Sequence, residues 1–341
     1  MKRVAAIITA FGVLSGGHAL AQTEDYIKGQ EVVDKMTAAT DEAANAEGWK
    51  FRLEVGSNIS VNSSSNVVGA VDGTTYQVGL LINGEASLKS GQHEWNNKLA
   101  LNHQQTKTPS IDPFVKTADN LEITSMYLYR LESIDWLGPF ARGRLQTQAL
   151  NGYLIRGEQV DVVGDVNQAD LGPGRRIKLT SAFEPMLLRE SAGLFGRPVD
   201  EKSIRFTATL GAGAQQIVSQ GGFAITDETD AADGNDKQIT VTEIESTNQV
   251  GAEIEAEATG ALTEQVSYTL SANLLYPIIT SVDTDLEGAE LLNTELNAKL
   301  AVKLSKWASL DYVLQARRIP LIVRDWQVTN GLLLSATFNV L

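Results

Sequence analysis

The sequence predicts an all-β protein: an antiparallel up-and-down transmembrane β-barrel of about twelve strands, preceded by an N-terminal signal peptide. The first observation is segment 49–62, which alternates apolar and polar residues as strand side chains alternate faces. The second is that similar segments recur, many near the length of about 9–11 residues that a tilted strand needs to cross a bilayer. The third is that short and long connections alternate, as they do in outer-membrane barrels.

The chain is predicted to have three regions. Residues 1–21 have the features of a secretory signal peptide: a basic start, an apolar run to about Leu14 and an Ala19-Leu20-Ala21 cleavage site. The alternative, a membrane anchor, needs a longer apolar run. Residues 22–48 form an acidic periplasmic leader, for which an amphipathic helix, a mobile segment and a plug in the lumen remain alternatives. Residues 49–341 form the barrel.

Charge and cysteine content exclude several functions. Loss of residues 1–21 leaves 26 of the 28 basic residues against 42 acidic ones, a net charge of −16. That charge argues against a nucleic-acid partner. The chain has no cysteine, so it has neither disulfides nor thiolate chemistry. Beyond the signal peptide, no apolar run is long enough for a helical membrane span.

The first half of the barrel is predicted to hold six strands. The apolar face of the opening segment comprises Trp49, Phe51, Leu53, Val55, Ile59 and Val61. The sixth segment is irregular, because Pro185 lies inside it and Arg189-Glu190 turns one charge outward, so we expect a bulge or an off-centre position. The six segments are 49–62, 76–89, 94–102, 120–131, 142–148 and 177–195. Their connections include a tight turn at Ser90-Gly91 and long loops at 63–73, 106–117 and 151–175.

The second half repeats the pattern and closes the barrel. The last segment must pair with the first, because a membrane-spanning sheet has no free edge. A soluble secreted β-sandwich or lipocalin-like barrel is the alternative, although such folds have shorter strands and need no regular alternation of loop length. The six segments are 204–212, 250–258, 266–276, 292–304, 310–314 and 326–340, with an acidic loop at 219–237.

Charged residues on the polar faces are predicted to line the lumen. Glu253, Glu255 and Glu257 form a ladder with a spacing of about 7 Å. Three arginines are placed to oppose this ladder. A structural ion-pair network, a field that selects ions or solutes and a metal site are the alternatives. The predicted lumen-lining set is Lys50, Arg52, Glu54, Arg142, Arg144, Arg205, Glu253, Glu255, Glu257, Glu295, Lys299 and Lys303.

No catalytic, cofactor-binding or metal-binding residue is predicted. Outer-membrane lipid hydrolases place a serine two residues after a histidine, so that both lie on one strand face. Here Gln105 follows His103 at that position. The acidic segment 227–236 lacks the spacing of a calcium loop, so it is predicted to be a solvated external loop, with loose bridging of divalent cations as the alternative.

Several segments resemble an uncharacterised family of Gram-negative outer-membrane β-barrels, a domain of unknown function. They are Gly91–Leu99, Val115–Thr124, Arg144–Gln148, Gly152–Tyr153 and Phe183–Pro185. A looser likeness to salt-induced outer-membrane proteins lies in 300–341. The chain departs from the family in having Val68-Gly69-Ala70 where an aromatic-Gly-Gly sequence is expected, and it ends without a terminal aromatic residue. The resemblance implies an outer-membrane barrel and brings no activity or site residue.

The sequence thus predicts a non-enzymatic protein of the outer membrane of a Gram-negative bacterium, either structural or a narrow passive pore for small solutes. Its predicted partner is outer-membrane lipid. A membrane-embedded lipid-acting enzyme and a soluble secreted β protein that binds a small apolar ligand are the alternatives. The solute and the oligomeric state do not follow from the residues.

Overall fold

The computed structural model describes residues 47–64, 73–166, 170–173, 175–201, 203–230, 237–305, 308–321 and 323–339. The predicted signal peptide and residues 22–46 of the predicted leader lie outside these ranges. Within the described ranges, no helix has the length and apolar character that a membrane crossing requires.

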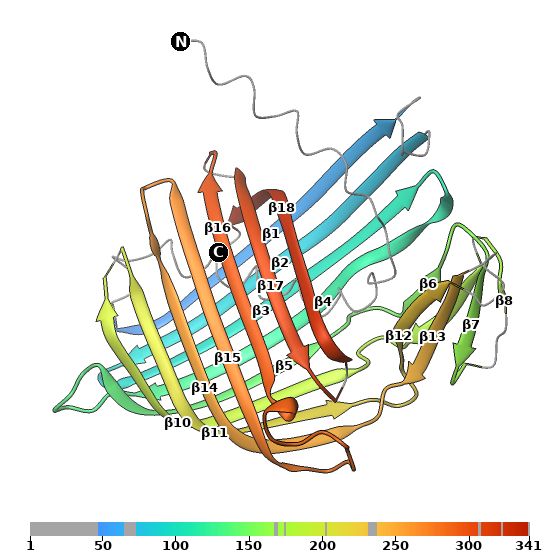
Figure 1. Cartoon of the computed structure of the whole chain (residues 1–341). Helices are drawn as coiled ribbons and strands as arrows, with labels where there is room; N and C mark the ends of the chain where they lie inside the picture. The colour runs from blue at the N-terminus through green and yellow to red at the C-terminus, as the bar shows by residue number, and fades with distance from the viewer. Residues whose placement is uncertain are drawn as a thin grey trace.

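Twelve antiparallel strands form a closed barrel, which confirms the predicted fold class (Figure 1). Each strand pairs antiparallel with its neighbours, with local register shifts in four of the pairs, and the alternating sequence pattern is the reason these segments are strands. The barrel strands are β1 (Gly48–Ser64), β2 (Gly73–Ser90), β3 (His93–Thr108), β4 (Ile111–Tyr129), β5 (Leu137–Thr147), β10 (Met186–Asp200), β11 (Arg205–Val218), β14 (Thr247–Ala261), β15 (Val266–Thr280), β16 (Asn293–Lys303), β17 (Ala308–Ile319) and β18 (Val323–Asn339).

The first and last strands close the barrel, as predicted. Glu54 in β1 is opposite Asn339 in β18, and Ser57 is opposite Ala336. The register at this seam covers residues 54–57 of β1, and pairing there joins the two strands that would otherwise be sheet edges.

The barrel is apolar outside and polar inside, the reverse of a soluble core. Large apolar side chains are exposed on the outer face, including Phe51 at 64% and Leu210 at 58%. Such an outer face is expected where the surroundings are lipid rather than water. The buried polar side chains include Glu54, Asn83, Asn102, Glu122, Gln215, Gln249, Glu253, Glu295, Asp311 and Arg317.

Aromatic side chains mark two levels on the outer face. Trp49 and Trp95 flank Leu88 in the sheet, and their rings lie 5.7 Å apart. Tyr76 lies on the same strand as Leu88, twelve residues away and near the opposite end. At a rise of about 3.3 Å per residue and a tilt of about 40°, the two levels are roughly 30 Å apart. That separation matches the hydrocarbon core of a bilayer.

The connections divide the barrel into a short-turn end and a long-loop end. At the short-turn end, β2 and β3 are joined by residues 91–92, where Gly91 adopts a φ of +58° that glycine reaches without strain. The predicted loop 106–117 is wrong, because β3 and β4 continue past the expected boundary and pair up to Thr108 and Ile111. The link between β17 and β18, residues 320–322, is also shorter than predicted.

The sixth predicted strand, 177–195, is in fact two strands. β9 (Arg176–Thr180) leaves the barrel, and β10 begins directly after Pro185. Proline has no N–H for the sheet, so it lies just before the strand instead of inside it. Arg189 then points inward, whereas Glu190 is exposed outside, four residues from the long-loop end of β10. The off-centre position explains how the outer face tolerates this carboxylate.

The predicted loops 151–175 and 219–237 contain strands that form an accessory module (Figure 1). β6 (Gly152–Ile155) pairs with β9, and a four-stranded sheet has the order β12 (Phe223–Asp230), β13 (Lys237–Glu243), β7 (Val160–Gly164), β8 (Asp170–Leu171). β13 and β7 are parallel. The module has its own apolar core, made of Leu154, Val160, Val162, Ile177, Leu179, Ile239 and Val241.

Candidate functional site

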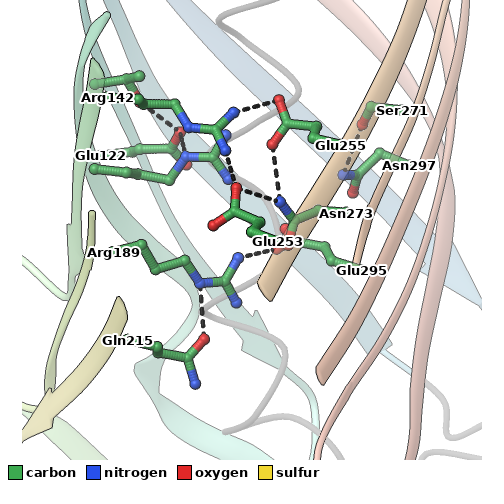
Figure 2. Close-up of polar contacts among 12 residues, drawn as sticks. Glu122, Arg142, Arg189, Gln215, Glu253, Glu255, Ser271, Asn273, Glu295 and Asn297 are labelled. Carbon is green, nitrogen blue, oxygen red and sulfur yellow. Dashed lines mark hydrogen bonds and ion pairs between the residues drawn. The ribbon is translucent and has the colours of Figure 1, made fainter. Parts of the chain in front are cut away.

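Inside the barrel, charged side chains from non-adjacent strands meet in one layer (Figure 2). Glu253 and Glu255 are two residues apart on β14, so the strand period directs both inward. The Arg142 guanidinium on β5 forms ion pairs with both, and its Nη1 lies 2.5 Å from Glu255 Oε1. β5 and β14 are separated by β10 and β11 in the barrel order, so this contact spans part of the lumen between non-adjacent strands; we call such a contact cross-lumen.

A second cross-lumen contact joins β10 and β16. Arg189 Nη1 donates to Glu295 Oε2 at 2.5 Å, and Arg189 Nε donates to Gln215 Oε1 at 2.9 Å. The Arg189 and Glu295 side chains are 12% and 8% exposed, so the pair is largely shielded from water. Charge-assisted bonds of this kind fix the position of both groups.

Neighbouring side chains complete the layer. Asn273 Nδ2 donates to Glu253 Oε1 at 3.1 Å and to Glu255 Oε2 at 2.9 Å. Arg144 Nε lies 3.6 Å from Glu122 Oε1. We call these groups the charged layer: Glu122, Arg142, Arg144, Arg189, Glu253, Glu255, Asn273 and Glu295.

A glycine makes room for the layer. A Cβ on Gly213 of β11 would lie 2.6 Å from Glu253 Oε2 and 2.9 Å from Glu253 Cβ. Real side chains do not approach so closely, so any larger residue here must displace the Glu253 carboxylate from Arg142.

An apolar cluster lies in the lumen toward the short-turn end. Leu128, Phe140 and Phe195 pack together, and Phe195 is fully buried. The Arg142 guanidinium is 5.9 Å from the centre of the Phe140 ring, so the cluster adjoins the charged layer. The described side chains thus narrow the lumen by two mechanisms, since charges bridge it and apolar groups exclude water from part of it.

The structure places the predicted lumen residues in several different surroundings. Arg142, Glu253 and Glu255 meet as the ladder hypothesis requires. Arg205 does not oppose the ladder: its Nε bonds Asp200 Oδ1 at 2.6 Å near the short-turn end, because it begins β11. Glu257 and Lys50 are half-buried, Lys299 is buried, Lys303 is exposed, and Arg52 pairs with Glu54 within β1.

Sequence reasoning missed Arg189 and did not select Glu122. The sequence does contain the information that places Arg189 in the lumen. If the strand is taken to begin at Met186, the alternation puts Arg189 on the same inward face as the buried Leu187. Its partner could not have been found this way, because β10 and β16 are distant in the chain and meet only across a closed barrel.

His103 lies outside the lumen, near the rim at the long-loop end. Its Nε2 is 3.0 Å from Gln105 Nε2, and its Nδ1 is 3.5 Å from the buried Asp119. Asp119 accepts the backbone N–H groups of Ala149 and Leu150 at 3.1 and 2.7 Å. This carboxylate therefore holds the chain where it leaves the barrel for the accessory module.

The acidic loops give no metal cluster in the described residues. In those ranges, no group of three or more histidine, aspartate or glutamate side chains could hold a metal ion. Of the predicted loop 227–236, residues 227–230 belong to β12 and 231–236 lie outside the described ranges. In the loop between β15 and β16, Asp285 Oδ1 accepts a hydrogen bond from Arg324 Nη2 of β18 at 2.6 Å, and this bond lowers the pKa of Asp285 below its ordinary value.

The apolar exterior, the closed sheet and the polar interior together define a membrane β-barrel with a constricted, charge-lined lumen. Residues 69–153 match the family described as "Protein of unknown function (DUF3078)". This range contains four of the five segments on which the sequence resemblance rests. None of the curated proteins matches the sequence.

Solved outer-membrane barrels resemble the fold at low identity. The COG4313 outer membrane channel from Pseudomonas putida F1 is 10% identical, with a TM-score of 0.36 over 88% of this chain and 97% of that one. The translocator domain of the autotransporter NalP from Neisseria meningitidis is 9% identical, with a TM-score of 0.38 over 92% and 99%. The Pseudomonas putida toluene transporter TodX is 10% identical, with a TM-score of 0.32 over 84% and 80%. At TM-scores this low, the fold of this chain is established by its own strand pairing.

Proposed function

We propose that this protein is a non-enzymatic outer-membrane barrel of a Gram-negative bacterium that acts as a narrow passive pore for small solutes. The observation that carries the proposal is the charged layer, in which Arg142 and Arg189 reach through the lumen to carboxylates on strands three and four positions away in the barrel order. The signal-like residues 1–21 and the apolar outer face support the outer-membrane location. In this orientation, the short-turn end faces the periplasm.

The charged layer would select solutes by size and by charge distribution. Arginines from β5 and β10 face glutamates from β14 and β16 (Figure 2). A small polar solute that passes between the two walls experiences a transverse electric field, whereas a large one meets bridging side chains. Twelve strands enclose less space than the 16–18 strands of wide aqueous channels.

A purely structural barrel is the second candidate, and a specific observation favours it. Glu122 and Phe195 are 2% and 0% exposed, so part of the lumen is filled. A lipid-acting enzyme receives less support, because Gln105 offers no nucleophile beside His103 and Asp119 is engaged by backbone N–H groups.

Swelling of liposomes that contain the purified protein tests the pore. We expect entry of uncharged solutes of triose size and exclusion of disaccharides. The double variant Arg189→Ala/Glu295→Ala should admit the disaccharides, because its lumen lacks one cross-lumen bridge. Heat-modifiable migration on a gel reports whether each preparation is folded. If the folded wild-type protein and the folded double variant both exclude every solute, the pore proposal is wrong and the protein is a structural barrel.

A further inference from the structure

We propose that one face of the accessory module binds the phosphate groups of lipopolysaccharide in the outer leaflet. The site is the basic face of the β6–β9 sheet, comprising Tyr153, Arg176 and Lys178, with the exposed Arg175 directly before β9. The inference rests on the proposed outer-membrane location and adds a headgroup-binding site to it.

The register of β6 and β9 produces this face. Leu154 pairs with Ile177, and both belong to the module core. Tyr153 pairs with Lys178, so by the strand period these two side chains point to the opposite side. Arg176 lies on the same side as Lys178, about 7 Å along the strand. Arg175, Arg176 and Lys178 are all exposed.

The three cations are a local exception in an acidic chain. The net charge of the whole sequence is −14. Within the described residues, Arg175, Arg176 and Lys178 have no carboxylate partner, whereas Arg156 and Lys237 elsewhere in the module both pair with Glu228. Unneutralised positive charge at one place on such a chain favours an anionic partner.

The geometry suits a phosphate. The Arg176 guanidinium lies 5.0 Å from the centre of the Tyr153 ring, and this stacking holds its planar group in place. A stacked guanidinium keeps its edge N–H groups free for bidentate bonds to phosphate oxygens. Lys178 lies across from the same ring and supplies a second positive charge.

The position of the basic face favours a lipid over a soluble anion. β6 and β9 extend from the barrel rim, where Leu150 and Phe183 expose 48% and 56% of their surface. Apolar side chains this exposed are expected at the edge of the hydrocarbon core. Lys178 is five residues from Phe183, a reach of at most about 18 Å. The headgroup layer adds roughly 5–8 Å to each side of the hydrocarbon core, so the phosphates and sugars above it lie within this reach.

Binding measurements on the full-length protein in neutral detergent test the site. The probes are lipopolysaccharide, the same lipopolysaccharide after enzymatic dephosphorylation, and inorganic phosphate. We expect Arg176→Gln/Lys178→Gln to weaken binding of lipopolysaccharide at least tenfold. Arg176→Lys, which keeps the charge but loses the planar group, should weaken it about threefold. The matched control is Arg324→Gln, since Arg324 is an exposed arginine at the long-loop end that is already paired with Asp285.

Three results would overturn the proposal. The first is that the folded double variant binds lipopolysaccharide with wild-type affinity. The second is that the wild type binds dephosphorylated and intact lipopolysaccharide equally well. The third is that inorganic phosphate binds as tightly as lipopolysaccharide, which would assign the face to a soluble anion. Liposome swelling in neutral lipids reports on the pore alone. Loss of swelling with lipopolysaccharide binding intact would therefore count against the pore, not against this site.

Discussion

The pair Arg189–Glu295 offers the sharpest test of the charged layer as a set of coupled cross-lumen bridges. We consider Arg189→Ala, Glu295→Ala and the double variant. Each single change leaves a charge without its main partner in surroundings where the two side chains are only 12% and 8% exposed. Breaking a buried pair in this way costs about 3–5 kcal/mol.

The lower end of that range applies here, because each remaining charge has other opposite charges nearby. The positive charges of Arg144 and Arg317 also attract the Glu295 carboxylate, and Arg189 is also attracted to Glu122. We therefore expect each single variant to lose about 3 kcal/mol. The double variant should lose about 3–4 kcal/mol, so the coupling free energy is roughly 2–3 kcal/mol.

Urea unfolding in phosphocholine vesicles, followed by tryptophan fluorescence, measures these free energies. The control cycle combines Arg189→Ala with Glu94→Ala, because Glu94 instead bonds Arg130 and Arg197 near the short-turn end. Distant sites should be additive to within about 0.5 kcal/mol. If the Arg189–Glu295 cycle is as additive as this control, the two side chains do not bridge the lumen and the reasoning fails.

Three further predictions concern other parts of the molecule. Glu255→Gln removes a negative charge from the charged layer, so the reversal potential in a salt gradient should shift toward anion selectivity. The control Glu190→Gln, on the outer face, should leave the reversal potential unchanged. Equal shifts in the two variants would refute a role of the layer in ion selectivity. Leu154→Ala should lower the stability of the accessory module by about 2–5 kcal/mol. Proteolysis should then cleave the module, while migration of the barrel on a gel stays heat-modifiable. If the module and the heat-modifiable migration are lost together, the module does not fold separately from the barrel. The pKa of Asp285 in the folded protein is lower than its ordinary value of 3.8. The bond to Arg324 therefore stabilises the folded loop fully at pH values above 3.8, and this stabilisation is lost as the pH falls through the folded-state pKa. Hydrogen exchange of residues 281–292 should therefore rise below that pH in the wild type and be insensitive to it in Asp285→Asn; the same acid response in both would refute the tether.

The barrel could be predicted from the sequence because its information is local. The alternation in 49–62 already separates a lipid face from a lumen face, and the same period recurs in most of the later strands. Pro185 indicates the correct start of β10, because a residue without an N–H group cannot donate to the neighbouring strand and here lies just before the pairing begins. Placing it inside a strand produced the error for 177–195.

The accessory module could not be predicted in the same way. Val160 and Val162 lie in a five-residue strand, and their packing partners Ile239 and Val241 come from a segment nearly eighty residues later. Each segment alone looks like a polar loop with a few apolar residues. The cross-lumen pairs have the same difficulty, because the partner of Arg189 depends on how many strands separate two walls of a closed sheet.

Single-channel conductance in planar lipid bilayers tests the central claim most directly. For the folded wild-type protein we predict small, discrete steps, with larger steps for Arg189→Ala/Glu295→Ala, whose lumen lacks one bridge of the charged layer. A wild-type conductance that is already large, or steps of equal size in the two proteins, would contradict a constriction made by these cross-lumen ion pairs.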